Sequence, residues 1–147
     1  MSAASTAKAP TVLQKTELPP EAYRQAVDQA DLAISITDPR ANILFANEAF
    51  ARVTGYRVDE IVGKNESVLS NHTTAPEVYK SMWKDLSAGR PWSGKLLNRR
   101  KDGELYLAEL TISPVVDAKG KTTHYLGMHR DVTEMHRLER VVRNQKK

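Results

Sequence analysis

The side chains that could do chemistry in this chain are few, and their types exclude most kinds of catalytic site. The chain has four histidines and no cysteine, so disulfides, cysteine-bound metals and thiol nucleophiles are excluded. The sequence lacks an ordered serine, histidine and aspartate set, a cluster of metal ligands and a glycine-rich phosphate loop. Isolated polar residues remain that can form hydrogen bonds or exchange protons: Ser35, Glu66, Asn98 and His129. They indicate a sensing or binding protein rather than an enzyme.

The overall composition is that of one globular domain with flanking segments. A chain of 147 residues, 40% hydrophobic and 27% charged, can form a single modest core. No apolar run is long enough to span a membrane, and residues 1–18 lack an apolar signal-peptide core, so we expect a flexible tail and a cytoplasmic protein. The net charge is +4, but acidic residues are interleaved and no aromatic side chains flank the basic runs. Nucleic acid is therefore not an expected partner.

Hydrophobic periodicity and turn residues predict an α+β fold. The expected order is helix 19–31, strands 32–38 and 43–46, a helix capped by Asn47, a short helix near 58–62, a long helix from Pro76, strands 92–99, 104–116 and 122–131, and a helix from 134. Thr74 and Glu77 have the pattern of a capping box for the long helix. This order fits one antiparallel sheet with helices on one face.

Several spaced motifs in this order resemble the PAS family of sensor domains. They are Asn47-Glu48-Ala49-Phe50, Thr54-Gly55-Tyr56, residues 60–65, Arg100-Lys101-Asp102-Gly103 and residues 125–134. The resemblance covers residues 22–134 and implies a five-stranded antiparallel sheet with short helices on one face, an N-terminal flanking helix and a C-terminal signalling helix. We therefore divide the chain into a tail (1–18), a flanking helix (19–31), a PAS domain (32–133) and the start of a helical or coiled-coil linker (134–147).

Residues 63–70 resemble the cofactor motif of flavin-binding light sensors but depart from it at several positions, two of which bear on the cofactor. Glu66 stands where those sensors carry the reactive cysteine, and Ser70 stands where they carry a glutamine. Without a thiol, a covalent photoadduct cannot form. The sequence is more similar to the redox-sensing branch of the family, in particular to the first PAS domain of nitrogen-fixation regulators of the NifL type. That resemblance implies FAD, bound non-covalently, oxidised by oxygen and reduced by cellular donors, although the sequence does not separate FAD from FMN.

The same resemblance implies six cofactor-binding residues. They are Asn98, Asn65, Glu66, His129, Trp83 and Ser35. Asn98 is expected to bind the polar edge of the flavin, because an amide supplies a hydrogen-bond donor and an acceptor without charge. The alternative is that Asn98 only ends a strand or caps the turn that follows. Asn65 could instead bond locally after Gly63, and Trp83 could be an ordinary core residue.

Glu66 and His129 are the two of these six residues whose side chains can gain or lose a proton near neutral pH. A carboxylate beside an apolar ring must either have a raised pKa or accept hydrogen bonds from nearby donors, so Glu66 could take up or release protons during flavin reduction. The alternative is that Glu66 is a surface residue that does not contact the cofactor. His129 takes the place of a glutamine that lies near flavin N5 in relatives. Its neutral imidazole can donate or accept a hydrogen bond, or it could merely fill space.

Alternation along the last strands predicts which side chains face the core. Tyr106 and His129 should face inward. The apolar residues that alternate with the inward positions should lie on the outer face of the sheet; they are Leu105, Leu107, Leu126 and Met128. An apolar outer face is not expected to be left bare to water, so the N-terminal helix, a second copy of the chain, or both should cover it, which predicts a homodimer. The helix after Thr133 should carry a signal to an output module or regulatory partner beyond Lys147. Two other functions stay open, a cofactor-free dimerisation module and a haem sensor. Haem is the weaker of these, because it needs an axial ligand and the long helix contains no histidine, while His72 precedes that helix in a loop.

Overall fold

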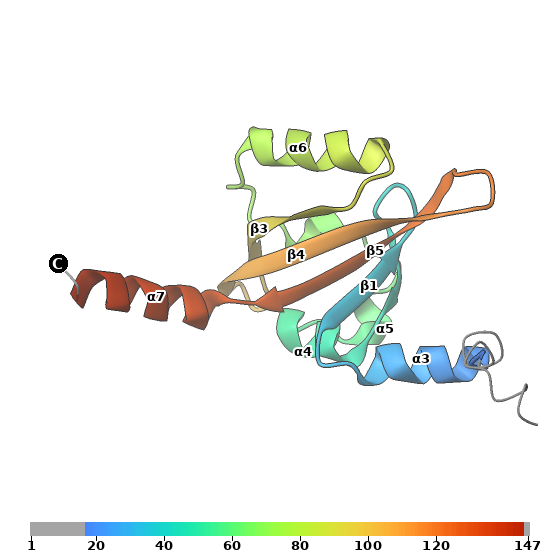
Figure 1. Cartoon of the computed structure of the whole chain (residues 1–147). Coiled ribbons are helices and arrows are strands. Elements are labelled where there is room, and N and C mark those ends of the chain that lie inside the picture. Colours follow the sequence, from blue (N-terminus) through green and yellow to red (C-terminus); the bar gives the residue numbers. More distant parts are fainter. Residues whose placement is uncertain (1–16, 146–147) are drawn as a thin grey trace, which may run out of the picture.

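A five-stranded antiparallel sheet, in the order β2-β1-β5-β4-β3, organises the chain (Figure 1). The computed structural model describes residues 17–145. The strands are β1 (Ala33–Thr37), β2 (Ile43–Ala46), β3 (Trp92–Arg99), β4 (Leu105–Val116) and β5 (Thr122–Asp131). Because β1 pairs with β5, the first and last strands lie side by side at the centre of the sheet. The predicted sheet is confirmed, and each predicted strand is present.

The helices are α3 (Pro20–Gln29), α4 (Glu48–Thr54), α5 (Val58–Ile61), the 3-10 helix η1 (Glu66–Leu69), α6 (Pro76–Ser87) and α7 (Thr133–Gln145). Helix α4 packs on β1, α5 on β2, and α6 on β3 and β4. Figure 1 shows α3 and α7 extending in different directions. Both leave the same end of the sheet, because Ala33 at the start of β1 pairs with His129 near the end of β5. This arrangement confirms an α+β fold with short helices on one face, one flanking helix before the first strand and another after the last.

The predicted capping box of α6 is wrong. Its N-cap is Ala75, which is extended and makes no side-chain cap hydrogen bond, and Pro76 is the first helical residue. A proline disfavours helical geometry in the residue before it, so the helix cannot begin earlier. Thr74 therefore lies one residue outside the cap position.

Asn47 joins three elements through its side chain. Its Oδ1 accepts hydrogen bonds from the backbone N–H of Phe50, which caps α4, and of Ile34 in β1. Its Nδ2 donates to the carbonyls of Val27 and Leu32. The predicted cap is confirmed, and the same buried carboxamide also fixes the end of α3 against β1 and α4.

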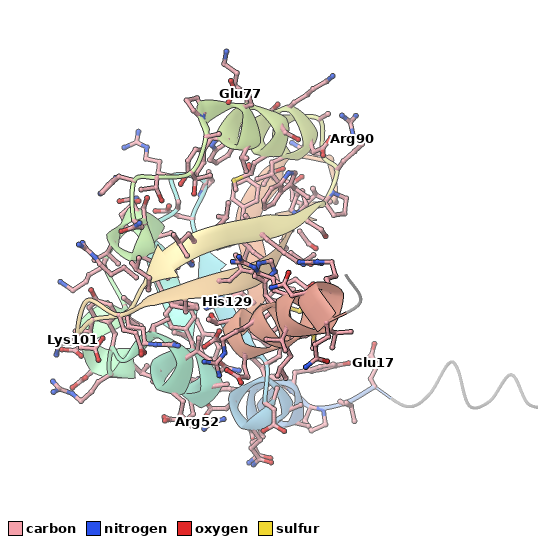
Figure 2. The ribbon with its side chains drawn as sticks, turned by 90° about the vertical axis from the view of Figure 1, so that its left-hand side faces the viewer. Glu17, Arg52, Glu77, Arg90, Lys101 and His129 are labelled. Atoms are coloured by element: carbon pink, nitrogen blue, oxygen red, sulfur yellow. The ribbon has the colours of Figure 1, made fainter. Side chains whose placement is uncertain are left out.

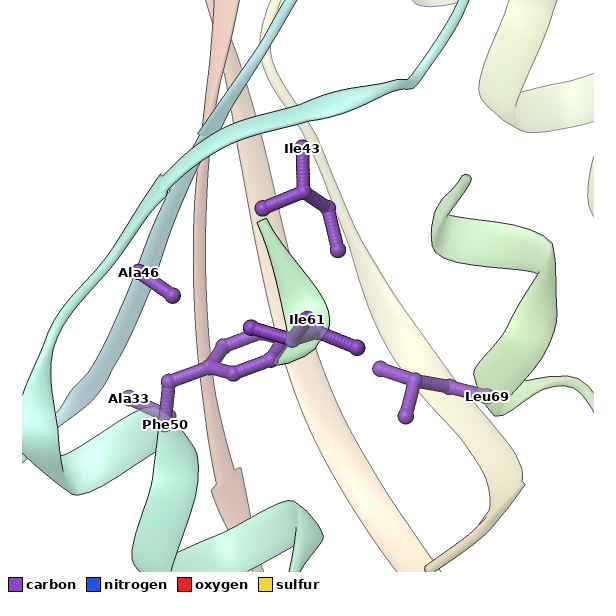
Figure 3. Close-up of a cluster of buried hydrophobic side chains, with 6 residues drawn as sticks. All are labelled: Ala33, Ile43, Ala46, Phe50, Ile61 and Leu69. Atoms are coloured by element: carbon purple, nitrogen blue, oxygen red, sulfur yellow. The ribbon is translucent and has the colours of Figure 1, made fainter. Parts of the chain in front are cut away.

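The hydrophobic core is formed by two separate clusters. The first lies between β1, β2 and the short helices (Figure 3) and contains Ala33, Ile43, Ala46, Phe50, Ile61 and Leu69. The second lies between α6 and the β3–β4 hairpin and contains Met82, Leu86, Trp92 and Leu96. Gly94 is required beside Trp92, because a Cβ there would lie 2.5 Å from the indole ring. A core divided in this way leaves space between the clusters.

The outer sheet face and the terminal helices are more exposed than the inner face. Leu105 is 44% exposed, and Leu107, Leu126 and Met128 are half-buried. Helix α3 contacts α4 and has no buried residue, so the prediction that it helps to cover the outer face is not fulfilled within the described residues. Residues 1–16 of the predicted tail and residues 146–147 lie outside the described part. No helix within residues 17–145 is long and apolar enough to cross a membrane.

Candidate functional site

A cavity of about 690 Å³ lies between the inner sheet face, η1 and α6. Its volume falls in the range of about 300–1,000 Å³ that is typical of small-molecule and cofactor sites. The apolar part of its wall comes from both core clusters and from β4: Leu69, Met82, Leu86, Leu96, Leu110 and Ile112. All six residues predicted to bind a cofactor line this one cavity. The fold therefore brings together side chains that are up to 94 positions apart, from Ser35 to His129.

The centre of the sheet forms the floor of the cavity. Tyr125, Gly127 and His129 of β5 all line it, as the alternation predicts. Gly127 pairs with Ser35 of β1, and a Cβ at residue 127 would lie 3.0 Å from Ser35 Oγ. Such a contact is tighter than ordinary packing allows, so glycine at this position keeps the floor open above the two central strands.

Glu66 lies on the cavity wall and is bonded to the floor. Its Oε1 accepts a 2.8 Å hydrogen bond from Ser35 Oγ, and Ser35 is only 3% exposed. Burial raises the pKa of the Glu66 carboxyl, while the hydrogen bond from Ser35 works in the opposite direction. The alternative of a surface carboxylate is therefore wrong for Glu66. A carboxyl in this position can hold a proton at a higher pH than an exposed one.

His129 lies at the inner end of the cavity, where Figure 2 shows it inside the fold. Its Nε2 is 3.1 Å from the Tyr106 hydroxyl, and its ring is nearly perpendicular to the Phe50 ring, with ring centres 5.5 Å apart. Burial lowers the pKa of His129 to about 4 and raises the pKa of Tyr106 to about 12. Both groups are therefore neutral at pH 7, and His129 does not merely fill space.

The two asparagines are placed differently. Asn98 lines the cavity from β3, opposite Tyr106 in the strand register, and its side chain lies close enough to Tyr106 to influence the pKa of the phenol. Asn65 uses its carboxamide for hydrogen bonds within the protein, one of them local and two to the loop between β1 and β2. Its Oδ1 accepts from the Ser67 N–H, and its Nδ2 donates to the Arg40 carbonyl and to Asn42 Oδ1. Asn65 therefore holds the wall in place, whereas Asn98 presents its amide beside the cavity.

Trp83 lies at the rim of the cavity rather than in the core. It is 43% exposed, and its ring meets Tyr125 edge to face with centroids 5.9 Å apart. The buried tryptophan of the chain is Trp92, which is 6% exposed. The core interpretation of Trp83 is therefore wrong. Its ring lies where it can cover one side of a bound molecule.

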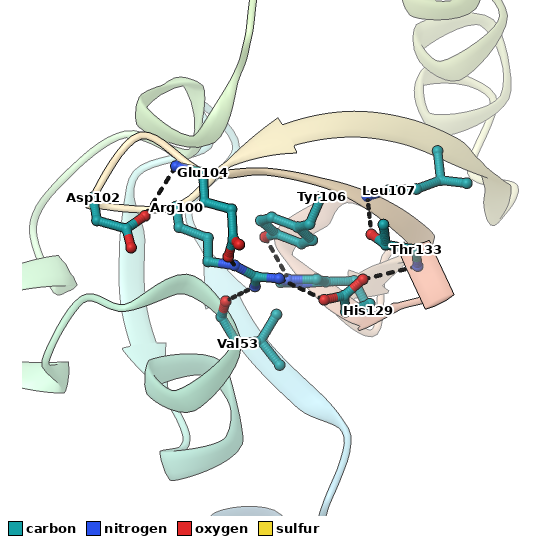
Figure 4. Close-up of polar contacts among 9 residues, drawn as sticks. Val53, Arg100, Asp102, Glu104, Tyr106, Leu107, His129 and Thr133 are labelled. Carbon is teal, nitrogen blue, oxygen red and sulfur yellow. Dashed lines mark hydrogen bonds and ion pairs between the residues drawn. The ribbon is translucent and has the colours of Figure 1, made fainter. Parts of the chain in front are cut away.

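Sequence reasoning identified Tyr106 only as an inward residue and missed its role as the partner of His129. From Tyr106 a chain of contacts leads away from the cavity (Figure 4). The Arg100 guanidinium lies 4.4 Å from the centre of the Tyr106 ring, and its Nη2 donates to Asp131 Oδ2 at 2.6 Å. Arg100 also donates to the Val53 carbonyl of α4. The guanidinium therefore connects the inner end of the cavity to the end of β5.

The chain of contacts ends at the first turn of α7. Asp131 Oδ1 accepts a 2.9 Å hydrogen bond from the backbone N–H of Thr133, and Thr133 Oγ1 accepts one from the Leu107 N–H at 2.8 Å. Burial works to raise the pKa of Asp131, but hydrogen bonds from Thr133 and Arg100 outweigh it and lower that pKa, so the carboxylate stays charged near neutral pH. Contiguous contacts thus join His129 in the cavity to the helix that leaves the domain.

An antiparallel five-stranded sheet beside a ligand-sized cavity, with a helix leaving from its last strand, is the architecture of a small sensor domain. The family model described as "PAS fold" matches residues 21–132. The chain belongs to the PAS family.

Two curated relatives show where in the family its similarity lies. The nitrogen fixation regulatory protein of Klebsiella oxytoca is 43% identical over 129 residues, which cover 88% of this chain and 26% of that protein. A blue-light-activated histidine kinase of Brucella canis is 34% identical over 128 residues, which cover 84% of this chain and 26% of that protein. The predicted similarity to the nitrogen-fixation regulators is confirmed. The chain spans about a quarter of the length of these relatives.

Solved structures of light-oxygen-voltage proteins have the same fold. An RNA-binding light-oxygen-voltage receptor superposes with a TM-score of 0.77 at 31% identity, covering 88% of this chain and 39% of that one. A light-oxygen-voltage domain studied with a flavin analogue gives a TM-score of 0.70 at 29% identity, covering 85% of this chain and 94% of that one. The neighbours thus include domains whose mechanism involves a flavin.

Proposed function

We propose that this chain is a cytoplasmic sensory input domain that binds FAD non-covalently and senses oxygen or redox state through the flavin. The supporting observation is the single cavity that gathers Ser35, Glu66, Asn98 and His129 around apolar walls. The similarity to a nitrogen-fixation regulator and to flavin-dependent light-oxygen-voltage domains points to the same class of ligand. The function is that of a sensor rather than an enzyme.

The residues present fit a flavin. A flavin ring is planar, apolar over most of its area and polar along one edge, where it carries carbonyl acceptors and an N–H donor. The apolar wall suits the ring, and the uncharged amide of Asn98 suits the polar edge because it offers both a donor and an acceptor. The absent side chain at Gly127 leaves room on the floor for a flat group. These are properties of the cavity itself and do not depend on the comparisons.

The chain's own residues would handle protons and hydrogen bonds around the cofactor. A bound flavin would supply reversible oxidation and reduction. Glu66, with its raised pKa and its hydrogen bond from Ser35, can take up or release a proton at the cavity wall. His129 stays neutral, and its two tautomers differ in which ring nitrogen carries the hydrogen. When the protonation of the bound flavin changes, His129 can switch tautomer, and its Nε2 then changes between accepting a hydrogen bond from the Tyr106 hydroxyl and donating one to it. Because there is no cysteine, a covalent bond through a thiol is excluded.

A change at His129 would reach α7 through Tyr106, Arg100 and Asp131. Helix α7 exposes an apolar strip at heptad-like spacing, formed by Met135, Leu138 and Val142, each at least 50% exposed. We propose that this strip and the outer sheet face pair with a second copy of the chain, and that α7 passes the signal to an output module or regulatory protein. The relatives, a regulator and a histidine kinase, are proteins with such outputs.

The visible absorption spectrum of the purified chain tests the nature of the ligand. The proposal predicts a structured flavin band at about 450 nm, whereas a Soret band would identify a haem. Haem is the weaker of the two alternatives, because α6 carries no histidine and His72, which lines the cavity, lies in the loop before that helix. A chain that stays colourless after incubation with FAD and desalting would instead be the cofactor-free dimerisation module. Chromatography of the cofactor released by heat then separates FAD from FMN.

A further inference from the structure

Tyr106 lies behind the cavity wall, next to two of the residues that line the cavity. It is fully buried and is not itself part of the lining, so it does not touch a ligand there. Its hydroxyl is 3.1 Å from His129 Nε2 on β5. Asn98 of β3 is opposite Tyr106 in the strand register. Burial raises the pKa of the phenol, and the nearby Asn98 amide works in the opposite direction. Tyr106 thus lies between an amide and an imidazole that both line the cavity.

The chemistry of these three groups favours one direction of hydrogen bonding. A tyrosine hydroxyl can donate one hydrogen bond and can also accept. A phenol is a stronger acid than a neutral imidazole N–H, and an imidazole nitrogen is a stronger base than a phenol oxygen, so donation from Tyr106 to His129 Nε2 is the favoured arrangement. The phenol oxygen is then available to the Asn98 amide, and an amide N–H directed at that oxygen lowers the pKa of the phenol, as Asn98 does.

This direction decides what the two lining residues present to the cavity. His129 is neutral at pH 7 and carries one ring hydrogen. If Nε2 accepts from Tyr106, that hydrogen is on Nδ1. Within residues 17–145 every fully enclosed side-chain nitrogen or oxygen has a hydrogen-bond partner, and Nδ1 has none among these residues, so it is open to the cavity that His129 lines. Asn98, with its N–H directed at Tyr106, keeps its Oδ1 as an acceptor.

We infer that Tyr106 is a positioning residue, whose buried hydroxyl makes His129 a hydrogen-bond donor and Asn98 an acceptor toward the cavity. This inference rests on the proposed flavin function and adds to it how the protein regulates the redox state of its ligand. Nitrogen N5 of an oxidised flavin accepts a hydrogen bond, whereas in the reduced flavin it carries hydrogen and donates. A donor at His129 therefore favours the oxidised ligand and opposes its reduction. Tyr106 exerts this effect through His129, without contact with the ligand.

Nitrogen-15 NMR of the full chain, before flavin is added, tests the assignment of the hydrogen on His129. A protonated and an unprotonated ring nitrogen have well-separated chemical shifts. In the wild-type chain Nδ1 of His129 should carry the hydrogen. Tyr106→Phe deletes the hydroxyl and keeps the ring that packs against Arg100, and it should populate both tautomers. The matched control is Tyr56→Phe, which deletes a hydroxyl beside the first core cluster and outside the cavity lining, and which should behave as wild type.

The reduction potential of bound FAD tests the consequence for the ligand. At a fixed potential, the ratio of reduced to oxidised FAD should be about three- to tenfold higher in Tyr106→Phe than in wild type, the range for one neutral hydrogen bond. This change corresponds to about 15–30 mV for a two-electron couple. Tyr56→Phe should leave the ratio unchanged. Titration with a redox dye of known potential, followed by the absorbance of the flavin, measures it.

The outcomes separate the role of Tyr106 from the flavin function. Hydrogen on Nδ1 in wild type, a mixture of tautomers in Tyr106→Phe and a raised ratio of reduced to oxidised FAD in that variant together support the inference. If wild-type His129 carries its hydrogen on Nε2, or if Tyr106→Phe changes neither the tautomer nor the ratio, the inference is refuted while the flavin function stands. If the wild-type chain binds no FAD, the proposed function is refuted and the effect on the ligand with it, and the NMR result separately decides whether Tyr106 sets the tautomer.

Discussion

Acidification should destabilise this domain through His129, and the size of the effect follows from its burial. Burial lowers the pKa of His129 from 6.5 to about 4. Between these values the unfolded chain binds a proton at this histidine that the folded chain does not. The contribution of His129 to the free energy of unfolding is therefore fully present above pH 6.5 and is lost as the pH falls towards 4. Because a tenfold change in proton affinity is worth about 1.4 kcal/mol, the full effect is about 3 kcal/mol. Lowering the pH from 7 to 5 should therefore reduce the free energy of unfolding by about 2 kcal/mol through this residue.

Glu66 contributes with the opposite sign. Its pKa is raised in the folded state, so its contribution to stability is greatest at low pH and is lost as the pH rises through the folded-state pKa. The pH profile of the wild-type chain is therefore a sum of opposing terms. The variant His129→Gln isolates the histidine contribution, because its pH dependence lacks that one term and retains the others.

Urea unfolding followed by tryptophan fluorescence measures the difference, since Trp92 lies in the core. Wild type should lose about 2 kcal/mol more than His129→Gln between pH 7 and pH 5. His136→Gln, which changes an exposed histidine on α7, should behave as wild type. Any baseline cost of the substitution cancels, because each protein is compared with itself at two pH values. If wild type and His129→Gln lose equal stability, then His129 is not held neutral by burial and the reasoning fails.

Three other substitutions test the parts of the structure separately. Asn47→Ala removes the cap of α4 and three further hydrogen bonds made by a fully buried carboxamide, so it should lower the free energy of unfolding by about 3 kcal/mol. Asn144→Ala on exposed α7 should cost less than about 0.5 kcal/mol; similar losses for the two variants in chemical denaturation would contradict the assignment. Gly127→Val should abolish flavin binding with little change in the circular dichroism spectrum, because its side chain meets Ser35 Oγ; full retention of flavin would show that the ligand does not use this floor. Glu66→Gln keeps an acceptor for Ser35 and loses the proton site, so it should retain flavin but change the rate of reoxidation by air and the redox-linked signal; unchanged kinetics and signalling in stopped-flow and output assays would remove Glu66 from the proton route.

Strand alternation and turn residues were sufficient to predict the sheet and the side chains that face the cavity. Tyr106 and His129 point inward, as expected from a period of two residues. Asn47 was predictable as a cap because an asparagine before an apolar helix has few other local roles. Its bonds to Val27 and Leu32 were not, because they depend on how α3 docks.

Contacts that depend on the register between strands or on the rotation of a helix could not be derived from the sequence. The bond between Tyr106 and His129 requires β4 and β5 to pair with Leu110 opposite His129. Lys80 reaches the cavity because α6 presents one particular face to β3, and neighbouring Lys84 does not line it. Helix α3 also lies beside α4 instead of across the outer face, which no periodicity in its own sequence determines.

Reduction and reoxidation of the purified, flavin-loaded chain test the central claim most directly. Under anaerobic conditions dithionite should bleach a protein-bound band at about 450 nm, and admission of air should restore it with the flavin still bound after desalting. A chain that retains no flavin, or whose bound flavin fails to reoxidise in air, would contradict the account of this domain as a flavin-based redox sensor.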